Sequence, residues 1–323
     1  MPRARLTHTQ AVWLMVLATL LWSMAGVVSR QLESASRFEV TFWRSAFNAL
    51  ALLMILPLWR WRERVAKSRV YGAQGLLERH WGILVRSRSF WISGVCWSIM
   101  FTAFMLALSF TSVANVLIML SLGPLLTAML AHGVMGHRLP MRTWFAVMLA
   151  GVGIAYMYGF QLWIALTDDA VDSHRLLLGT LTALCVPVAG AVNWTVVQRS
   201  QSQGQPIDLV PAVMVGAVLS AAFTLPLALP WSASASDVMW LAFLGLAQLA
   251  IPCSLAVVCA RVLKAPEMSL LGLLEIIFGI LLAWVLVDEV PSSAVLLGGG
   301  VVMLALVLNE WLAWRDRRLI KMS

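Results

Sequence analysis

Ten long apolar stretches, each close to 20 residues, account for most of this 323-residue chain. A helix needs roughly 20 apolar residues to cross about 30 Å of hydrocarbon. Because every backbone amide in hydrocarbon must be paired within its own segment, such stretches must be helices. The sequence therefore predicts an all-α membrane protein with about ten transmembrane helices. These helices are expected near residues 10–30, 38–59, 90–109, 113–135, 142–162, 176–198, 208–230, 238–260, 267–287 and 292–313.

The composition excludes several other classes of protein. Apolar residues make up 61% of the chain and charged residues only 12%, too few to keep the surface of a soluble domain of this size hydrated. The four cysteines all lie in apolar stretches, and they are interpreted as packing residues. His132 and His137 are five residues apart, which does not match the i,i+4 spacing of a helical metal site. With no nucleophile motif and no P-loop, we predict no catalytic residue, no cofactor and no metal.

The basic residues predict the orientation in the membrane. Ten spans place both termini on one side, and nineteen Lys and Arg residues then fall on that side. Only Arg30, Arg37 and Arg175 fall on the other side, and Arg44 lies within a span. This bias predicts cytoplasmic termini in the cell membrane, and it explains the +8 net charge without a nucleic-acid partner.

The basic loop at residues 60–89 is open to two interpretations. Leu76, Leu77 and Trp81 fall on one helical face there, beside clusters of basic residues. A short amphipathic helix on the inner membrane surface would use both features. A solvated linker accounts for them equally well.

The chain repeats itself with a period of five spans, which divides it into residues 1–162 and 163–323. When Gly123-Pro124 is aligned with Glu275-Ile276, Gly136-His137 falls on Asp288-Glu289. Because five is odd, the second unit enters the membrane upside down relative to the first. The sequence therefore predicts two inverted five-helix repeats, an architecture common in alternating-access transporters.

Four motifs carry a resemblance to a known family. They are LLWS at Trp22, TFWRSAFNALALL around Arg44, S-x-G-P-L-L-x-A-M-L from Ser121, and LLEIIFGILLAWVLVDE from Leu273. Over nearly the whole chain, this order resembles the EamA-type transporters of the drug/metabolite transporter superfamily. The chain departs from the family pattern at Gly123, Ile276 and His137, where the family usually has Glu, Pro and Glu.

The resemblance implies a secondary transporter of metabolites, often an exporter of amino acids or related compounds. Its partners would then be a small-molecule substrate, with proton coupling as one option, and the lipid bilayer. The oligomeric state, the substrate and the coupling ion stay open. A membrane-embedded enzyme that acts on a lipid or lipid-linked substrate is the alternative.

Glu275 is the candidate coupling residue. It lies eight residues into its predicted span, about 12 Å deep at 1.5 Å per residue. An ionised carboxylate at such a depth costs about 2.5–3.5 kcal/mol, so it normally faces water or a partner. Glu275 is therefore expected to carry a proton or to bind a cationic substrate group. A protonated carboxyl with a purely structural hydrogen bond is the alternative.

Arg44 is the second charged candidate, six residues into its span and thus about 9 Å deep, with Asn48 one turn further on the same face. A permanently charged guanidinium there needs an anion or carbonyl partner. The functional interpretation is recognition of a substrate carboxylate or phosphate. The alternatives are an ion pair with Glu39 or Glu33, or snorkelling to the outer interface.

Three further residues are expected to border a central cavity between the two repeats: Trp22, Gly123 and Asn193. The repeat places Gly123 at the depth of Glu275. Gln248 is a lesser candidate, for which a hydrogen bond between helices is the expected use.

Overall fold

The structure is a computed structural model, and it describes residues 6–68, 85–135, 141–167, 173–202, 209–259, 262–263, 265–288 and 290–322. Over these residues it contains helices and no strands. The helices, with η1 a π-helical segment, are α1 (His8–Ser29), α2 (Arg37–Ser68), α4 (Arg88–Phe110), α5 (Val113–Leu120), α6 (Gly123–Met135), α7 (Met141–Thr167), α8 (Ser173–Ser202), α9 (Val210–Ala228), α10 (Ala235–Phe243), η1 (Leu244–Ala250), α11 (Ile251–Cys259), α12 (Ala265–Val287) and α13 (Ser293–Met322).

The predicted membrane architecture is confirmed. Seven segments of the described chain are long and apolar enough to cross a bilayer, and three shorter apolar helices lie at residues 144–156, 271–287 and 293–309. Each coincides with one of the ten predicted spans. Several helices run past the predicted boundaries, and α2 continues to Ser68. Residues 69–84 lie outside the described residues, so both interpretations of the 60–89 loop stay predictions.

Two predicted spans are interrupted, and a proline accounts for each break. The span at 113–135 divides into α5 and α6, which begins at Gly123-Pro124. Pro124 has no N–H to donate to the carbonyl of Leu120, and this missing hydrogen bond favours a break at this position. The span at 238–260 contains η1, which ends at Ala250, two residues before Pro252. Pro252 likewise leaves the carbonyl of Gln248 without its usual partner, and the wider turns of a π-helix accommodate the defect.

Helix packing follows a pattern that is unchanged when the two halves are exchanged. The exchange pairs α1 with α8, α2 with α9, α4 with α10–α11, α5–α6 with α12, and α7 with α13. Contacts of α1 with α12 and α11 then correspond to contacts of α8 with α5–α6 and α4. Three further contacts join equivalent helices of the two halves and are therefore unchanged by the exchange: α2 with α9, α5 with α12, and α7 with α13. Two structurally related halves would pack in this way, and the division at residue 162 stays a prediction.

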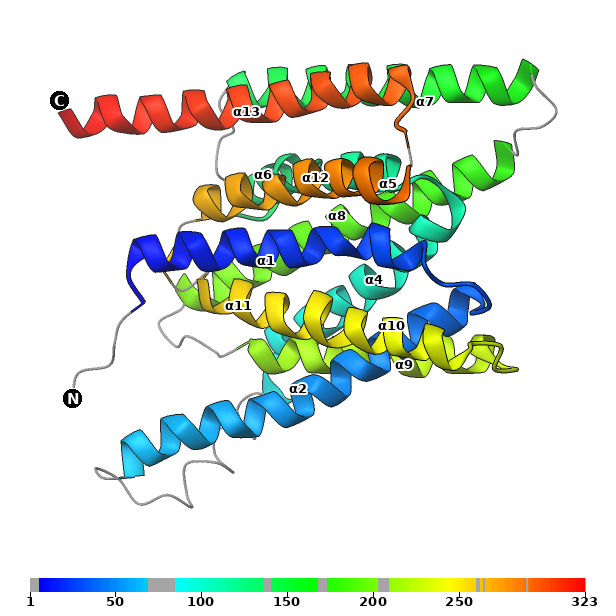
Figure 1. Ribbon diagram of the computed structural model, residues 1–323. Helices are drawn as coiled ribbons and strands as arrows, with labels where there is room; N and C mark the ends of the chain where they lie inside the picture. The colour runs from blue at the N-terminus through cyan, green and yellow to red at the C-terminus, as the bar shows by residue number, and fades with distance from the viewer. Residues whose placement is uncertain are drawn as a thin grey trace.

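The α7–α13 pair lies at one face of the bundle (Figure 1). These helices approach so closely that a Cβ on Gly153 would lie 2.6 Å from the carbonyl oxygen of Gly298. Helix α1 begins and α13 ends at the same end of the bundle, as an even number of spans requires (Figure 1). The α1–α2 connection and the start of α10 lie at the opposite end (Figure 1). We call this second end the loop end.

Candidate functional site

Arg44 is the largest fully buried side chain of the described residues, with 1% of its surface exposed. Its Nε and Nη2 atoms donate hydrogen bonds to the side-chain oxygen of Gln248, at 3.2 and 2.8 Å. Its Nη1 donates to the carbonyl oxygen of Phe101 at 3.4 Å. The guanidinium carbon also lies 5.5 Å from the centre of the Phe104 ring, within the range of a cation–π interaction. Snorkelling is therefore wrong for Arg44, because its partners lie within the protein.

Gln248 lies in the π-helical segment η1 and is buried. Its amide nitrogen donates to the carbonyl oxygen of Trp22 at 3.1 Å, so one side chain links α2, η1 and α1. The predicted use of Gln248 in bonds between helices is confirmed. Gly245 allows the close approach of η1 to α2, because a Cβ there would lie 2.8 Å from both the Arg44 carbonyl oxygen and the Asn48 nitrogen.

Glu275 on α12 lies near enough to Arg44 for their opposite charges to interact. No hydrogen bond to the Glu275 carboxylate occurs within the described part of the chain, and the side chain is only half-buried. The two residues thus interact through space without forming a contact ion pair. Cys253 on α11 lies near Trp22 and near enough to both Arg44 and Glu275 for its thiol to interact with their charges.

Asn48 lies one turn beyond Arg44 on α2 and is fully buried. Neither its amide oxygen nor its amide nitrogen has a hydrogen-bond partner within the described residues. A buried amide without partners is costly, by about 1–3 kcal/mol for each unsatisfied group, and such groups often mark a position for water or a ligand.

We call Arg44 and the residues around it, Gln248, Glu275, Cys253, Trp22 and Asn48, the charged cluster. Asn193 and Gly123 lie outside it. The side-chain oxygen of Asn193 on α8 accepts a hydrogen bond from Ser93 at 2.6 Å. Ser93 precedes Phe101 by eight residues of α4, a separation of about 12 Å along the helix axis. Gly123 begins α6, and the nearest atom to a Cβ built on it would be Pro187 Cβ, at 4.0 Å. The structure thus brings together Arg44, Glu275, Trp22 and Asn48, while these two candidates occupy the α6–α8 side.

The suggested ion pair of Arg44 with Glu39 or Glu33 is wrong. The Glu39 carboxylate instead accepts hydrogen bonds from the backbone and hydroxyl of Ser232, at 3.0 and 2.7 Å, and from the backbone of Ala233 at 2.9 Å. At Glu33 the described contact is made by the backbone nitrogen, which donates to Asp237 at 3.0 Å. The Arg44 guanidinium lies deeper, where α2 meets η1 and α4.

Glu39 and Asp237 form a reciprocal clasp at the loop end. Glu39, in the first turn of α2, binds the connection between α9 and α10. Asp237, in the first turn of α10, binds the α1–α2 connection through the backbone of Glu33 and the backbone and hydroxyl of Ser34. Both carboxylates are buried. Each half of the chain thus supplies one acid that holds a loop of the other half.

Two residues of the charged cluster were missed as site residues. Gln248 was expected only to bridge helices, and Cys253 was interpreted as a packing residue. A polar side chain in the middle of a predicted span, four residues before Pro252, is the signal that could have identified Gln248 as a site residue. Among the described residues, no group of three or more His, Cys, Asp and Glu side chains is arranged to hold a metal ion. His137 and the side chain of His132 lie outside the part that is described.

Comparisons with known proteins agree with the fold and the apolar helices. The model of the EamA-like transporter family matches residues 9–159. No curated protein matches the sequence. One solved structure, described only as the crystal structure of a protein, aligns over 96% of this chain and 99% of its own length, with a TM-score of 0.59 and 17% identity. At that identity the likeness concerns the fold alone. The resemblance identified from the sequence motifs is confirmed over residues 9–159.

Proposed function

We propose that this chain is a secondary transporter that moves a small metabolite by alternating access. The match of residues 9–159 to the EamA-like transporter family supports an integral membrane protein of the drug/metabolite transporter type. The proposed substrate carries a carboxylate or phosphate for Arg44, and an amino-acid-like zwitterion fits the site best. The proposed direction is export from the cytoplasm. Both termini are proposed to lie in the cytoplasm, because nineteen basic residues fall on their side of the predicted topology.

The observation that carries this proposal is the buried guanidinium of Arg44, which has no contact counter-ion among the described residues. The hydrogen bonds of the Arg44 side chain go to uncharged oxygens, those of Gln248 and Phe101. A buried guanidinium held only by neutral groups gains more from a carboxylate, because charge-assisted hydrogen bonds are roughly twice as strong as neutral ones. The acid group of a substrate is well suited to supply that carboxylate.

Glu275 would then serve the other end of the substrate or the coupling ion. Its carboxylate has no hydrogen-bond donor among the described residues and is half-buried. It could therefore receive a proton or a substrate ammonium without first breaking an internal bond. A zwitterion placed between Arg44 and Glu275 would pair both charges at once, and this favours an amino-acid-like compound over a simple anion.

The position of the charged cluster supports alternating access. The cluster draws on α1, α2 and α4 from the first half and on η1, α11 and α12 from the second. Arg44 reaches Phe101 on α4 while it also holds Gln248 on η1, so one side chain bridges several helices. A relative movement of those helices would change these contacts, which would link substrate binding to the opening of one side.

Roles for the remaining candidates follow from their surroundings. We propose that the unpartnered amide of Asn48 binds a polar substrate group, and that Trp22 forms an adjoining wall beside Cys253. Gly123 and Asn193 would border the substrate route on the side of α6 and α8. A Cβ built on Gly123 would meet no atom closer than 4.0 Å, so space remains beside it.

Transport into proteoliposomes tests the proposal. Purified protein would be screened with radiolabelled amino acids, other metabolites with carboxylate groups, and matched neutral amides. We expect uptake of a carboxylate compound and none of its amide. Arg44→Gln should abolish that uptake, whereas removal of an exposed charge by Arg88→Gln should preserve it. Uptake that is equal for acid and amide, or unchanged in Arg44→Gln, would contradict the assignment.

A further inference from the structure

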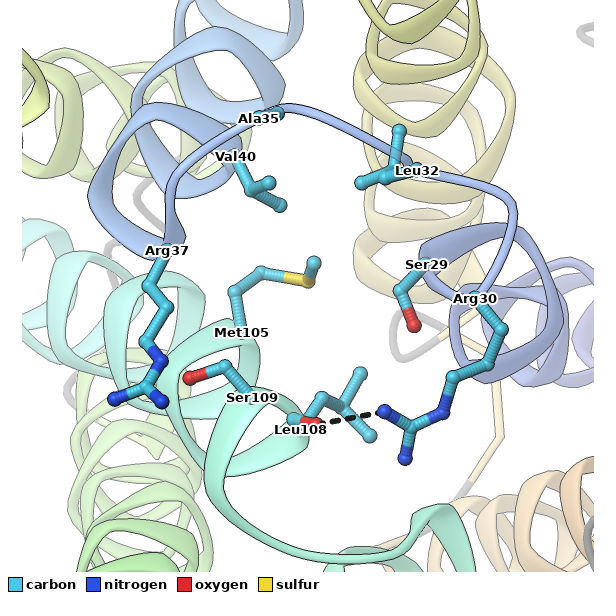
Figure 2. A pocket seen from close by; sticks show the side chains of 9 residues that line it. All are labelled: Ser29, Arg30, Leu32, Ala35, Arg37, Val40, Met105, Leu108 and Ser109. Atoms are coloured by element: carbon cyan, nitrogen blue, oxygen red, sulfur yellow. Dashed lines mark hydrogen bonds between the residues drawn. The ribbon is translucent and has the colours of Figure 1, made fainter. Parts of the chain in front are cut away.

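A pocket of about 180 Å³ lies at the loop end, between the end of α1, the start of α2 and the end of α4 (Figure 2). An engineered apolar cavity of ~150 Å³ holds a benzene molecule, so this volume admits a small organic group. Arg30 and Arg37 lie on opposite sides of the pocket, with Met105 and Ser109 of α4 between them (Figure 2). No carboxylate is among the described residues that line it.

Arg37 is the cation best placed to receive a ligand. Its guanidinium carbon lies 4.7 Å from the centre of the Phe110 ring, and its side chain is half-buried. No hydrogen bond or ion pair of this side chain with another described residue is present. A guanidinium that is positioned by an aromatic ring keeps its planar edge of N–H donors available for an oxyanion.

Arg30 adds positive charge from the opposite wall. Its Nη1 and Nη2 atoms donate to the carbonyl oxygens of Leu108 and Thr111, at 3.4 and 3.3 Å, so the last turn of α4 holds the side chain in place. The hydroxyl groups of Ser29 and Ser109 donate to the carbonyls of their own helices, so they leave the recognition of an anion to the arginines.

The distribution of charge in the sequence makes this pairing unusual. The topology assigns only three of the chain's basic residues to the loop end, and two of them line this pocket. Basic residues on the outer side work against the positive-inside bias that orients a membrane protein. The presence of two such arginines in one pocket is therefore better explained by the binding of a ligand than by the orientation of the protein in the membrane.

We propose that this pocket binds an anionic group, a carboxylate or phosphate, through Arg37 and Arg30. The short apolar part next to that group would pack against Met105, Leu108 and Val40. An oxyanion between two guanidinium groups gains charge-assisted hydrogen bonds that a neutral group of the same shape does not.

The pocket also leads toward Arg44, a step that rests on the proposed transport function. Arg37 and Arg44 are seven residues apart on α2, so they share one face and lie about 10 Å apart along the axis. Met105, in the pocket, and Phe101, which binds Arg44, are one turn apart on α4. The pocket is thus the outer vestibule from which an anionic substrate exchanges with the Arg44 site.

Thiol labelling of Ser109→Cys tests the pocket without any transport measurement. The full chain would be placed in vesicles of neutral phosphatidylcholine, and the protein without this substitution gives the background of the four native cysteines. We expect an anionic methanethiosulfonate reagent to react several-fold faster than its trimethylammonium analogue. Adding Arg30→Gln and Arg37→Gln should remove this preference, while Arg88→Gln, at the other end of α4, should keep it.

Protection experiments then identify the chemistry of the ligand. Hexanoate or hexyl phosphate should slow the labelling of Ser109→Cys, and hexanol should not. Protection by these soluble probes in neutral vesicles indicates a free solute as the ligand. Protection that requires vesicles with phosphatidylglycerol indicates that the ligand is a lipid headgroup. That result would support the anion site and would exclude its role as a vestibule for the substrate.

Equal labelling by both reagents, or protection by hexanol as strong as by hexanoate, would overturn the proposed anion site. Thermal unfolding of each variant shows whether a loss of preference reflects misfolding. Because labelling needs no flux, a chain that transports nothing but shows anion-selective labelling would refute the transport function alone.

Discussion

Arg44 and Gln248, 204 residues apart in the sequence, are joined by two hydrogen bonds to one amide oxygen, at 3.2 and 2.8 Å. This places a permanent cation deep in the bundle with a neutral partner. Gln248 in turn donates to the carbonyl oxygen of Trp22, so its orientation is fixed from both sides. A site with a fixed cation and no contact counter-ion can attract an anionic substrate group.

Removing the partner of Arg44 should therefore destabilise the protein. Gln248→Ala deletes both hydrogen bonds and leaves the guanidinium with Phe101, so we expect a loss of about 2–4 kcal/mol in the free energy of unfolding. Thermal unfolding in detergent measures this as a lower midpoint temperature. Ser254→Ala on α11, which removes only a hydroxyl bonded to the backbone of Ala250 one turn earlier, serves as the control and should change little. Equal stability of the two variants would contradict the assigned role of Gln248.

Giving Arg44 a permanent counter-ion should block transport. Gln248→Glu places a carboxylate where the amide oxygen accepts both hydrogen bonds, so Arg44 would be paired before any substrate arrives. We expect a folded protein whose substrate affinity falls at least tenfold, or about 1.4 kcal/mol. Binding or uptake measured beside the wild type checks this. An affinity that stays at the wild-type value would mean that Arg44 does not receive the substrate.

The close packing of η1 on α2 should be intolerant of one added carbon. In Gly245→Ala the new Cβ would lie 2.5 Å from Phe47 Cβ, so overpacking should cost about 1–3 kcal/mol. Gly151→Ala on α7 meets no heavy atom within 4 Å, and it should be neutral or stabilising. Thermal unfolding of the two variants gives the comparison, and a Gly245→Ala protein as stable as Gly151→Ala would contradict the described packing.

The clasp at the loop end should contribute measurable stability. Glu39→Ala leaves the donors of Ser232 and Ala233 without their carboxylate, and we expect a cost of about 2–3 kcal/mol. Glu33→Ala is the matched control, because the described contact at Glu33 is made by its backbone. Combining Glu39→Ala with Asp237→Ala should cost more than either alone, as measured by midpoint temperature. A Glu39→Ala midpoint equal to that of Glu33→Ala would count against the clasp.

Most of the fold could be predicted from the sequence because hydropathy sets the length and position of each membrane helix. The breaks were not predicted, although Pro124 and Pro252 were visible, since a proline in a helix can produce a kink, a chain break or a π-helical turn. Which of these occurs depends on the packing of neighbouring helices, as it does where Gly245 meets α2.

The site was only partly predictable for a related reason. Charged residues deep in a span are conspicuous, so Arg44 and Glu275 were found from their depth alone. Their partners lie on helices far away in sequence, and no local pattern distinguishes Glu39 from Gln248 as the partner of Arg44. Glu39 is nearer in sequence, but it is occupied by Ser232 and Ala233. Asn193 was grouped with Arg44 by depth, whereas it pairs with Ser93 on another part of α4.

Glu275 offers the most direct test of the central claim, that this chain is a transporter whose opposed charges bind and couple the substrate. Glu275→Gln keeps the size of the side chain and removes its ability to take up and release a proton. Uptake driven by a pH gradient would be compared with counterflow exchange at equal pH, in the same proteoliposomes and with the compound found in the screen. If Glu275 carries the coupling proton, the variant should lose accumulation and retain exchange. If Glu275 binds a substrate ammonium, both should fail. Wild-type uptake across a pH gradient in Glu275→Gln vesicles would contradict the account.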